Sequence, residues 1–153
     1  MNSQSPIQYK VYGTLMWFLT ALFACRVAAQ LLILNFPELP LPAFERWHSE
    51  VLAYPILVTF QLAILLVLGF LSQRVFSDQL IPNRKRAQRL LVLGATYFLI
   101  MLFRLCLSIS IIHLPGLSEL AWFQRPLPSF FHLVLASFIL MLARCYLTGE
   151  KHV

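Results

Sequence analysis

The sequence predicts an all-α integral membrane protein, a bundle of four transmembrane helices in a single membrane domain over residues 1–153. The composition is 59% hydrophobic and only 12% charged, and the mean hydropathy is +0.76, values that exclude an ordinary soluble domain. The apolar residues also fall into four blocks of about 20 residues, the length that crosses a hydrocarbon core of about 30 Å.

The four expected transmembrane helices are residues 12–34, 51–71, 90–112 and 130–147. The first helix could be mistaken for a cleaved signal segment, but Arg26 interrupts its apolar run where cleavage would need it continuous. We therefore expect it to be retained. Pro126 and Pro128 are expected to stiffen the last outer loop and to prevent regular helix there. The connecting segments are too short to fold alone.

The orientation follows from the positive charges, because Lys and Arg near span ends are retained on the cytoplasmic side. Eight of them would lie on one side and two, Arg46 and Arg125, on the other. The eight are Lys10, Arg74, Arg84, Lys85, Arg86, Arg89, Arg144 and Lys151. Both termini and the 72–88 loop are thus predicted to be cytoplasmic, most simply in a bacterial inner membrane. The basic residues 84–86 are interpreted as an orientation signal that also favours anionic headgroups, so the charge of +6 needs no nucleic-acid partner.

The two halves of the chain show signs of an internal repeat. Arg26 and Arg104 each lie eleven residues before a proline, and the offset of 78 that aligns them also pairs Gln30 with Ser108. Further along, the Val-Leu-Ala of 51–53 matches that of 134–136. The expected repeats are residues 12–71 and 90–147. Each would be a helical hairpin of the same orientation, related to the other by an axis along the membrane normal.

The two arginines are the main candidates for a functional site. Each lies nine residues before the first residue of an outer loop, Asn35 or His113, roughly 13 Å at about 1.5 Å per residue. An arginine cannot lose its charge at that depth, and the acidic residues are all outside the spans: Glu38, Glu45, Glu50, Asp78, Glu119 and Glu150. The arginines therefore require polar side chains, a water-filled cavity or a ligand that carries negative charge or carbonyl oxygen.

The predicted ligand-binding residues are Arg26, Gln30, Gln61, Arg104 and Ser108. Gln30 and Ser108 each lie one helical turn beyond an arginine, and Tyr97 lies seven residues before Arg104 on the same helix face. Gln61 is the strongly polar residue near the middle of its span. Its alternative role is to join two helices by a hydrogen bond.

A second polar group is expected at the outer face: His48, Glu50, His113, Arg125 and His132. The histidines His48, His113 and His132 could ligate a metal or haem, and Glu45 with His48 has the Glu-x-x-His spacing of di-iron bundles. The three histidines lie at span boundaries and no second Glu-x-x-His pair exists, so no metal site is predicted. The three cysteines lie in apolar helices, and no catalytic constellation is visible. The sequence does not predict an enzyme.

Three functional hypotheses remain at this point. The first is a binding or transport protein with an outward-facing polar pocket for a small anion or for an amphiphile such as a quinone or lipid headgroup. The second is a subunit or assembly factor of a larger membrane complex, or a homo-oligomer. The third is a haem- or metal-binding electron-transfer protein. The sequence itself requires no cofactor, and the bilayer is the one partner that it implies.

Overall fold

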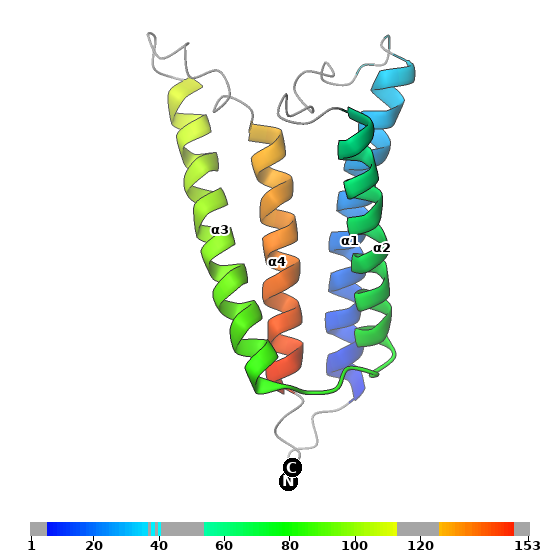
Figure 1. Ribbon diagram of the computed structural model, residues 1–153, viewed down its shortest axis with the longest axis vertical. Helices are drawn as coiled ribbons and strands as arrows, with labels where there is room; N and C mark the ends of the chain where they lie inside the picture. Colours follow the sequence, from blue (N-terminus) through cyan, green and yellow to red (C-terminus); the bar gives the residue numbers. More distant parts are fainter. Residues whose placement is uncertain (1–5, 37, 39, 41–53, 113–125, 149–153) are drawn as a thin grey trace.

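The computed structural model describes residues 6–36, 38, 40, 54–112 and 126–148, and these form four helices. The helices are α1 (Pro6–Asn35), α2 (Tyr54–Phe76), α3 (Arg84–Ile112) and α4 (Pro126–Thr148) (Figure 1). All four are long and apolar enough to cross a membrane. The predicted all-helical architecture with four such helices is therefore confirmed.

The helices extend beyond the apolar runs that predict them. α1 begins at Pro6 and α3 at Arg84. In both helices the backbone is already helical in the residues that precede the apolar run. The expectation that Pro126 and Pro128 prevent helix is wrong, since both lie in the first turn of α4. Proline is tolerated there because the first amide groups of a helix have no intrahelical acceptor.

The connection between α2 and α3 is fixed by capping bonds at both of its ends. At the end of α2, the amide of Gln79 donates to the Arg74 carbonyl at 2.9 Å and that of Asp78 to the Val75 carbonyl at 3.1 Å. With Asp78 at a φ of 54°, this is the Schellman arrangement. Asn83 caps α3, where its Oδ1 accepts from the Arg86 amide at 3.0 Å.

The four helices pack as two hairpins that are joined side by side. α1 packs on α2 and α3 packs on α4, and a smaller contact between α1 and α4 holds the hairpins together (Figure 1). The core along these contacts includes Met16 and Phe23 of α1, Leu68 of α2, and Phe138 and Leu142 of α4. The helices α2 and α3 lie at the two ends of this arrangement and make no extensive contact with each other.

The helix bounds bear on the proposed repeat in two ways. Adding the offset of 78 to α1 gives 84–113, which matches α3 at 84–112. α2 and α4 have the same length and align with each other at an offset of 72. The Val-Leu-Ala match needs an offset of 83 and therefore does not align these two helices. The repeat itself stays a prediction.

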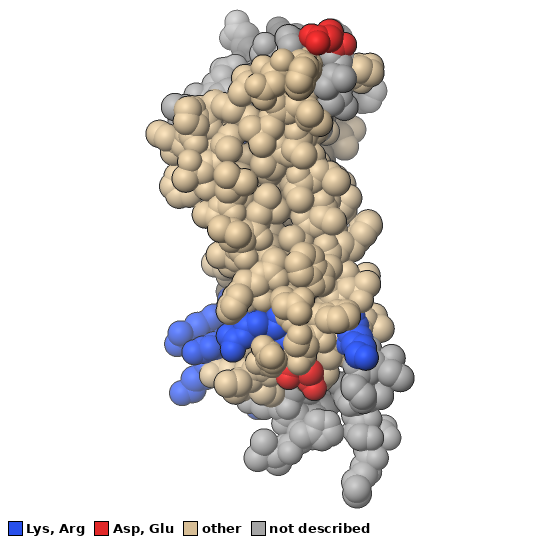
Figure 2. Space-filling view, turned by 90° about the vertical axis from the view of Figure 1, so that its right-hand side faces the viewer, with Lys and Arg blue, Asp and Glu red and all other residues tan. Residues whose placement is uncertain are grey.

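The described basic residues other than Arg26 and Arg104 gather at one end of the molecule. The start of α1, the α2–α3 connection and the end of α4 all lie at this end (Figure 1). On the face shown in Figure 2, the Lys and Arg side chains form one band, and a long stretch of surface beyond it carries no charged side chain. This separation of charge from apolar surface is the pattern expected of a protein that crosses a membrane.

Candidate binding site around Arg26

Arg26 lies where the two hairpins meet. Its side chain is only 8% exposed, and its guanidinium carbon lies 5.2 Å from the ring centroid of Phe131 on α4 and 6.0 Å from that of Phe23. These cation–π contacts hold the charge between α1 and α4. The Nε atom is buried and has no hydrogen-bond partner within the described part of the chain. Aromatic faces therefore meet the charge, while the Nε donor is left without an acceptor among the described residues.

Tyr97 of α3 and His132 of α4 form a second part of the site. The Tyr97 hydroxyl and the His132 Nδ1 are joined by a hydrogen bond of 2.6 Å, and the two rings meet edge to face with centroids 6.0 Å apart. α4 begins six residues before His132, at Pro126, so His132 lies in the second turn of the helix and not at its first residues. His132 is half-buried inside the bundle.

Electrostatic interactions connect these residues into one cluster. Arg26 interacts with Tyr97 across the hairpin junction, and the charges of both Arg26 and Arg104 act on His132. Arg104 is itself half-buried on α3. We call Arg26, Tyr97, Arg104 and His132 the polar cluster. It combines two permanent positive charges with a phenol and an imidazole, from three different helices.

Gln30 and Gln61 lie between α1 and α2. The Gln61 Nε2 donates to the Gln30 Oε1 at 3.2 Å, and both side chains are buried. Lower in the same interface, the Thr20 and Ser72 hydroxyls are 3.2 Å apart. The alternative expectation for Gln61, a hydrogen bond between helices, therefore matches this contact. Its Oε1 is buried and has no partner among the described residues.

Ser108 completes the predicted set on α3, one turn beyond Arg104. It is fully buried, on the same side of α3 as Gly94, which faces Ile139 and Leu140 of α4. The five predicted ligand residues thus divide among three interfaces: Arg26 between the hairpins, the two glutamines within one hairpin, and Arg104 and Ser108 on α3 of the other.

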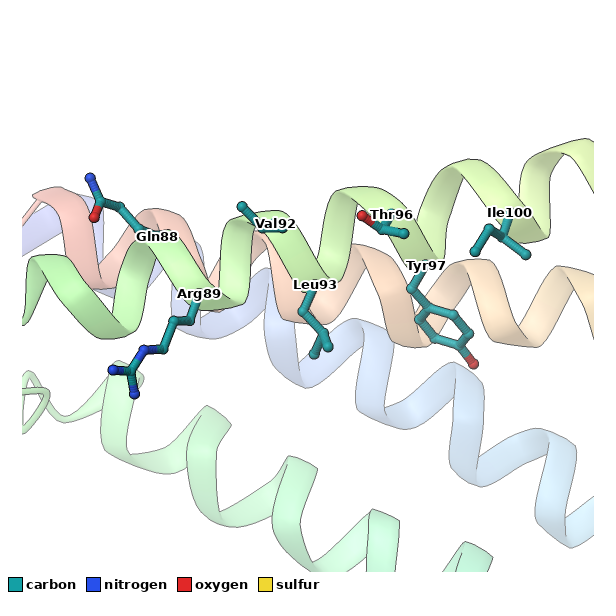
Figure 3. Close-up of a pocket in the computed structure, with 7 residues that line it drawn as sticks. All are labelled: Gln88, Arg89, Val92, Leu93, Thr96, Tyr97 and Ile100. Carbon is teal, nitrogen blue, oxygen red and sulfur yellow. The ribbon is translucent and has the colours of Figure 1, made fainter.

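A large groove runs along α3 and reaches the polar cluster. Its volume is about 630 Å³, and its lining residues are Gln88, Arg89, Val92, Leu93, Thr96, Tyr97 and Ile100. Figure 3 shows Arg89, Leu93 and Tyr97 projecting from one side of α3, toward the helices drawn below it. The wall between Arg89 and Tyr97 is mainly apolar, and Ile100 continues it beyond Tyr97. We call it the α3 groove, and Tyr97 belongs to both it and the polar cluster.

Four of the five residues predicted for the outer-face cluster lie outside the described residues: His48, Glu50, His113 and Arg125. The proposed histidine ligands His48 and His113 are among them. Within the described ranges, no group of three His, Cys, Asp or Glu residues could hold a metal ion.

Sequence reasoning missed the α3 groove and the bond between Tyr97 and His132. The periodicity already placed Tyr97 on the Arg104 face of its helix, but the register between α3 and α4 was needed to bring it to His132. None of the five predicted ligand residues lines the groove. Family models, curated proteins and solved structures give no match to this chain, so the functional argument rests on the site.

Proposed function

We propose that this chain is a multi-pass membrane protein that binds a carbonyl-bearing amphiphile, with a quinone as the best-fitting class. The polar cluster would hold the carbonyl oxygen, and the α3 groove would hold the apolar part. The observation that carries the proposal is the buried Arg26 guanidinium, whose Nε has no hydrogen-bond partner among the described residues.

The first support for this proposal is that the helices offer no carboxylate to the arginines of the polar cluster. None of the four helices contains Asp or Glu, so no carboxylate within them neutralises Arg26 or Arg104. Cation–π contacts are worth about 0.5–1 kcal/mol at exposed sites and about 2 kcal/mol when desolvated, so the rings of Phe23 and Phe131 offset much of the cost of about 2.5–3.5 kcal/mol for an arginine at the centre of a membrane helix. The rings leave the Arg26 Nε donor without an acceptor oxygen among the described residues, and a ligand oxygen would supply one.

The depth of the cluster favours a small headgroup. Arg26 lies nine residues before the end of α1, roughly 13 Å at about 1.5 Å per residue. A phospholipid bound here would have to bury its whole charged headgroup at that depth. A quinone ring is mostly apolar and presents two carbonyl oxygens, which suit the positive charges and the phenol of Tyr97.

The α3 groove supplies the complementary apolar site. It extends from Gln88 to Ile100 along one side of α3, about 18 Å at 1.5 Å per residue. Because Tyr97 lines the groove and is hydrogen-bonded to His132, a chain in the groove would place its headgroup beside the polar cluster. The membrane location, the bacterial inner membrane and the cytoplasmic termini belong to this proposal. The four apolar helices support the first of these, and the band of basic side chains at one end of the described residues supports the orientation.

The test compares ligand retention by two arginine variants. The protein is purified in mild detergent, and bound amphiphiles are extracted and identified by mass spectrometry. Wild type and R84M should retain the same carbonyl-bearing compound, whereas R26M should lose at least nine-tenths of it. R84M is the matched control, because Arg84 lies at the basic end and lines neither the groove nor the cluster.

A second pair of variants separates the apolar part of the site from the polar part. V92W fills the α3 groove, while L99W places the same side chain at an exposed position of α3 that does not line it. V92W should reduce retention and L99W should not. Equal retention by wild type and R26M, or no amphiphile in wild type, would refute the proposal.

One observation supports a second candidate, a subunit of a larger membrane complex. Only 6% of the most apolar window of α3 and 17% of that of α2 is buried within the chain, so both helices present wide apolar faces to their surroundings. A partner that co-purifies at constant stoichiometry through stringent washing would favour this function. A stable monomer or dimer with a bound small molecule would favour the first.

A further inference from the structure

A small basic cavity lies at the basic end of the bundle, away from the polar cluster. Its volume is about 50 Å³, and its lining residues are Arg74, Gln79, Leu80, Ile81, Arg86 and Tyr146. They come from the last turns of α2 and α4, the α2–α3 connection and the first turn of α3. The volume exceeds the roughly 10–15 Å³ that one water requires and suits a group of several heavy atoms.

Among the described residues, the lining carries two positive charges and no carboxylate. Asp78, the acid of the α2–α3 connection, is exposed and does not line the cavity. Arg74 and Arg86 both line this cavity, and their like charges repel each other. An anion between them would be attracted to both, so the cavity favours an anion. Planar guanidinium groups recognise phosphate oxygens through paired N–H donors, and the phenol of Tyr146 can supply a further hydrogen bond.

The backbone around both arginines is fixed before any ligand binds. The Arg74 carbonyl accepts the capping bond from the Gln79 amide at 2.9 Å. The Arg74 side chain is also held, because its guanidinium carbon lies 5.4 Å from the Phe70 ring centroid. The Arg86 amide donates to Asn83 Oδ1 at 3.0 Å. A site held in this way loses less entropy when it binds a ligand.

The geometry points to a phosphate-binding site formed by Arg74, Arg86 and Tyr146 at the basic end of the bundle. The phosphate belongs to a membrane lipid headgroup or is free in solution. This site is separate from the polar cluster and does not depend on the function proposed above. Binding at this site depends on Arg74 and Arg86 and not on their neighbours Arg84 and Lys85. This dependence distinguishes the site from a diffuse basic surface.

The experiment measures binding of three probes to the full chain in detergent by native mass spectrometry. The probes are a short-chain phosphatidylglycerol, the matching diacylglycerol without phosphate, and inorganic phosphate. The variant R74Q/R86Q is compared with R84Q/K85Q, which removes the same charge from positions that do not line the cavity. We expect at least tenfold weaker binding in R74Q/R86Q and less than threefold in R84Q/K85Q.

The probes also distinguish the two sources of phosphate. Retention of phosphatidylglycerol without an effect of inorganic phosphate assigns the site to a lipid headgroup, and binding of inorganic phosphate assigns it to a free anion. Equal losses in both double variants, equal binding of diacylglycerol, or no binding of either phosphate probe to wild type overturns the inference. If R74Q/R86Q does not fold, R74K/R86K keeps the charges but loses the paired donors, and it should still weaken binding severalfold.

Discussion

Replacement of Gly13 by alanine should separate α1 from α2 at their basic end. A Cβ atom at Gly13 would lie 2.6 Å from the Cα and 2.9 Å from the backbone nitrogen of Phe76 on α2. Carbon atoms in contact are about 3.5–4.0 Å apart, so the two backbones must move apart by about 1 Å. Backbone cannot rotate away as a side chain can.

The expected magnitude is a balance of two effects. Overpacking of this kind costs typically about 1–3 kcal/mol, while alanine gains up to about 1 kcal/mol over glycine in a helix. G13A should therefore lower the free energy of unfolding by roughly 1–2 kcal/mol. Close approach of helices at small residues is a general feature of membrane bundles, so the same loss is expected in detergent or in lipid.

Two other glycines serve as matched controls. A Cβ at Gly69 would meet only the far end of the Trp17 ring at 3.8 Å, an ordinary contact, and at Gly94 it would meet side-chain atoms of Ile139 and Leu140 at 3.0 Å. G69A should be neutral or slightly stabilising, and G94A should fall between the other two. The assay is unfolding in mixed micelles followed by circular dichroism. If G13A is as stable as G69A, the packing of α1 on α2 described above is wrong.

Three further changes test individual contacts by the same unfolding assay. R26M should change the stability of the ligand-free protein by no more than about 1–2 kcal/mol, because the cost of the buried charge that it removes is largely offset by the contacts with Phe23 and Phe131 that it also removes; a larger loss of stability would show that Arg26 is structural. Q61L should lower stability by roughly 1 kcal/mol through the lost bond to Gln30, and an unchanged midpoint would count against that bond. D78G should raise stability by about 0.5–1 kcal/mol, because glycine adopts the positive φ without a steric cost; destabilisation would contradict the assigned Schellman cap.

The number and type of the helices could be predicted from the sequence because hydropathy and length alone decide them. Their ends could not, since α3 begins with the basic residues from Arg84 and α4 with Pro126. An apolar run marks where a helix is buried in lipid, but capping groups such as Asn83 mark where it begins.

The candidate site could be predicted only in part. Arg26 stands out in the sequence because its charge interrupts an apolar run, and the structure places it at the junction of the hairpins. The bond from Tyr97 to His132 depends on how α3 packs on α4, which residue spacing within one helix cannot reveal. Gln30 and Gln61 look like ligand residues in the sequence, but they bond to each other across α1 and α2.

The most direct test of the central proposal is the carbonyl stretching frequency of a bound quinone labelled with ¹³C at its carbonyl groups. An infrared difference spectrum of the wild-type protein with this probe should show a band shifted to lower frequency by a hydrogen bond to Arg26. R84M should show the same band, and R26M should lose the shift. The same spectrum in wild type and R26M would contradict the assignment of Arg26 to the ligand.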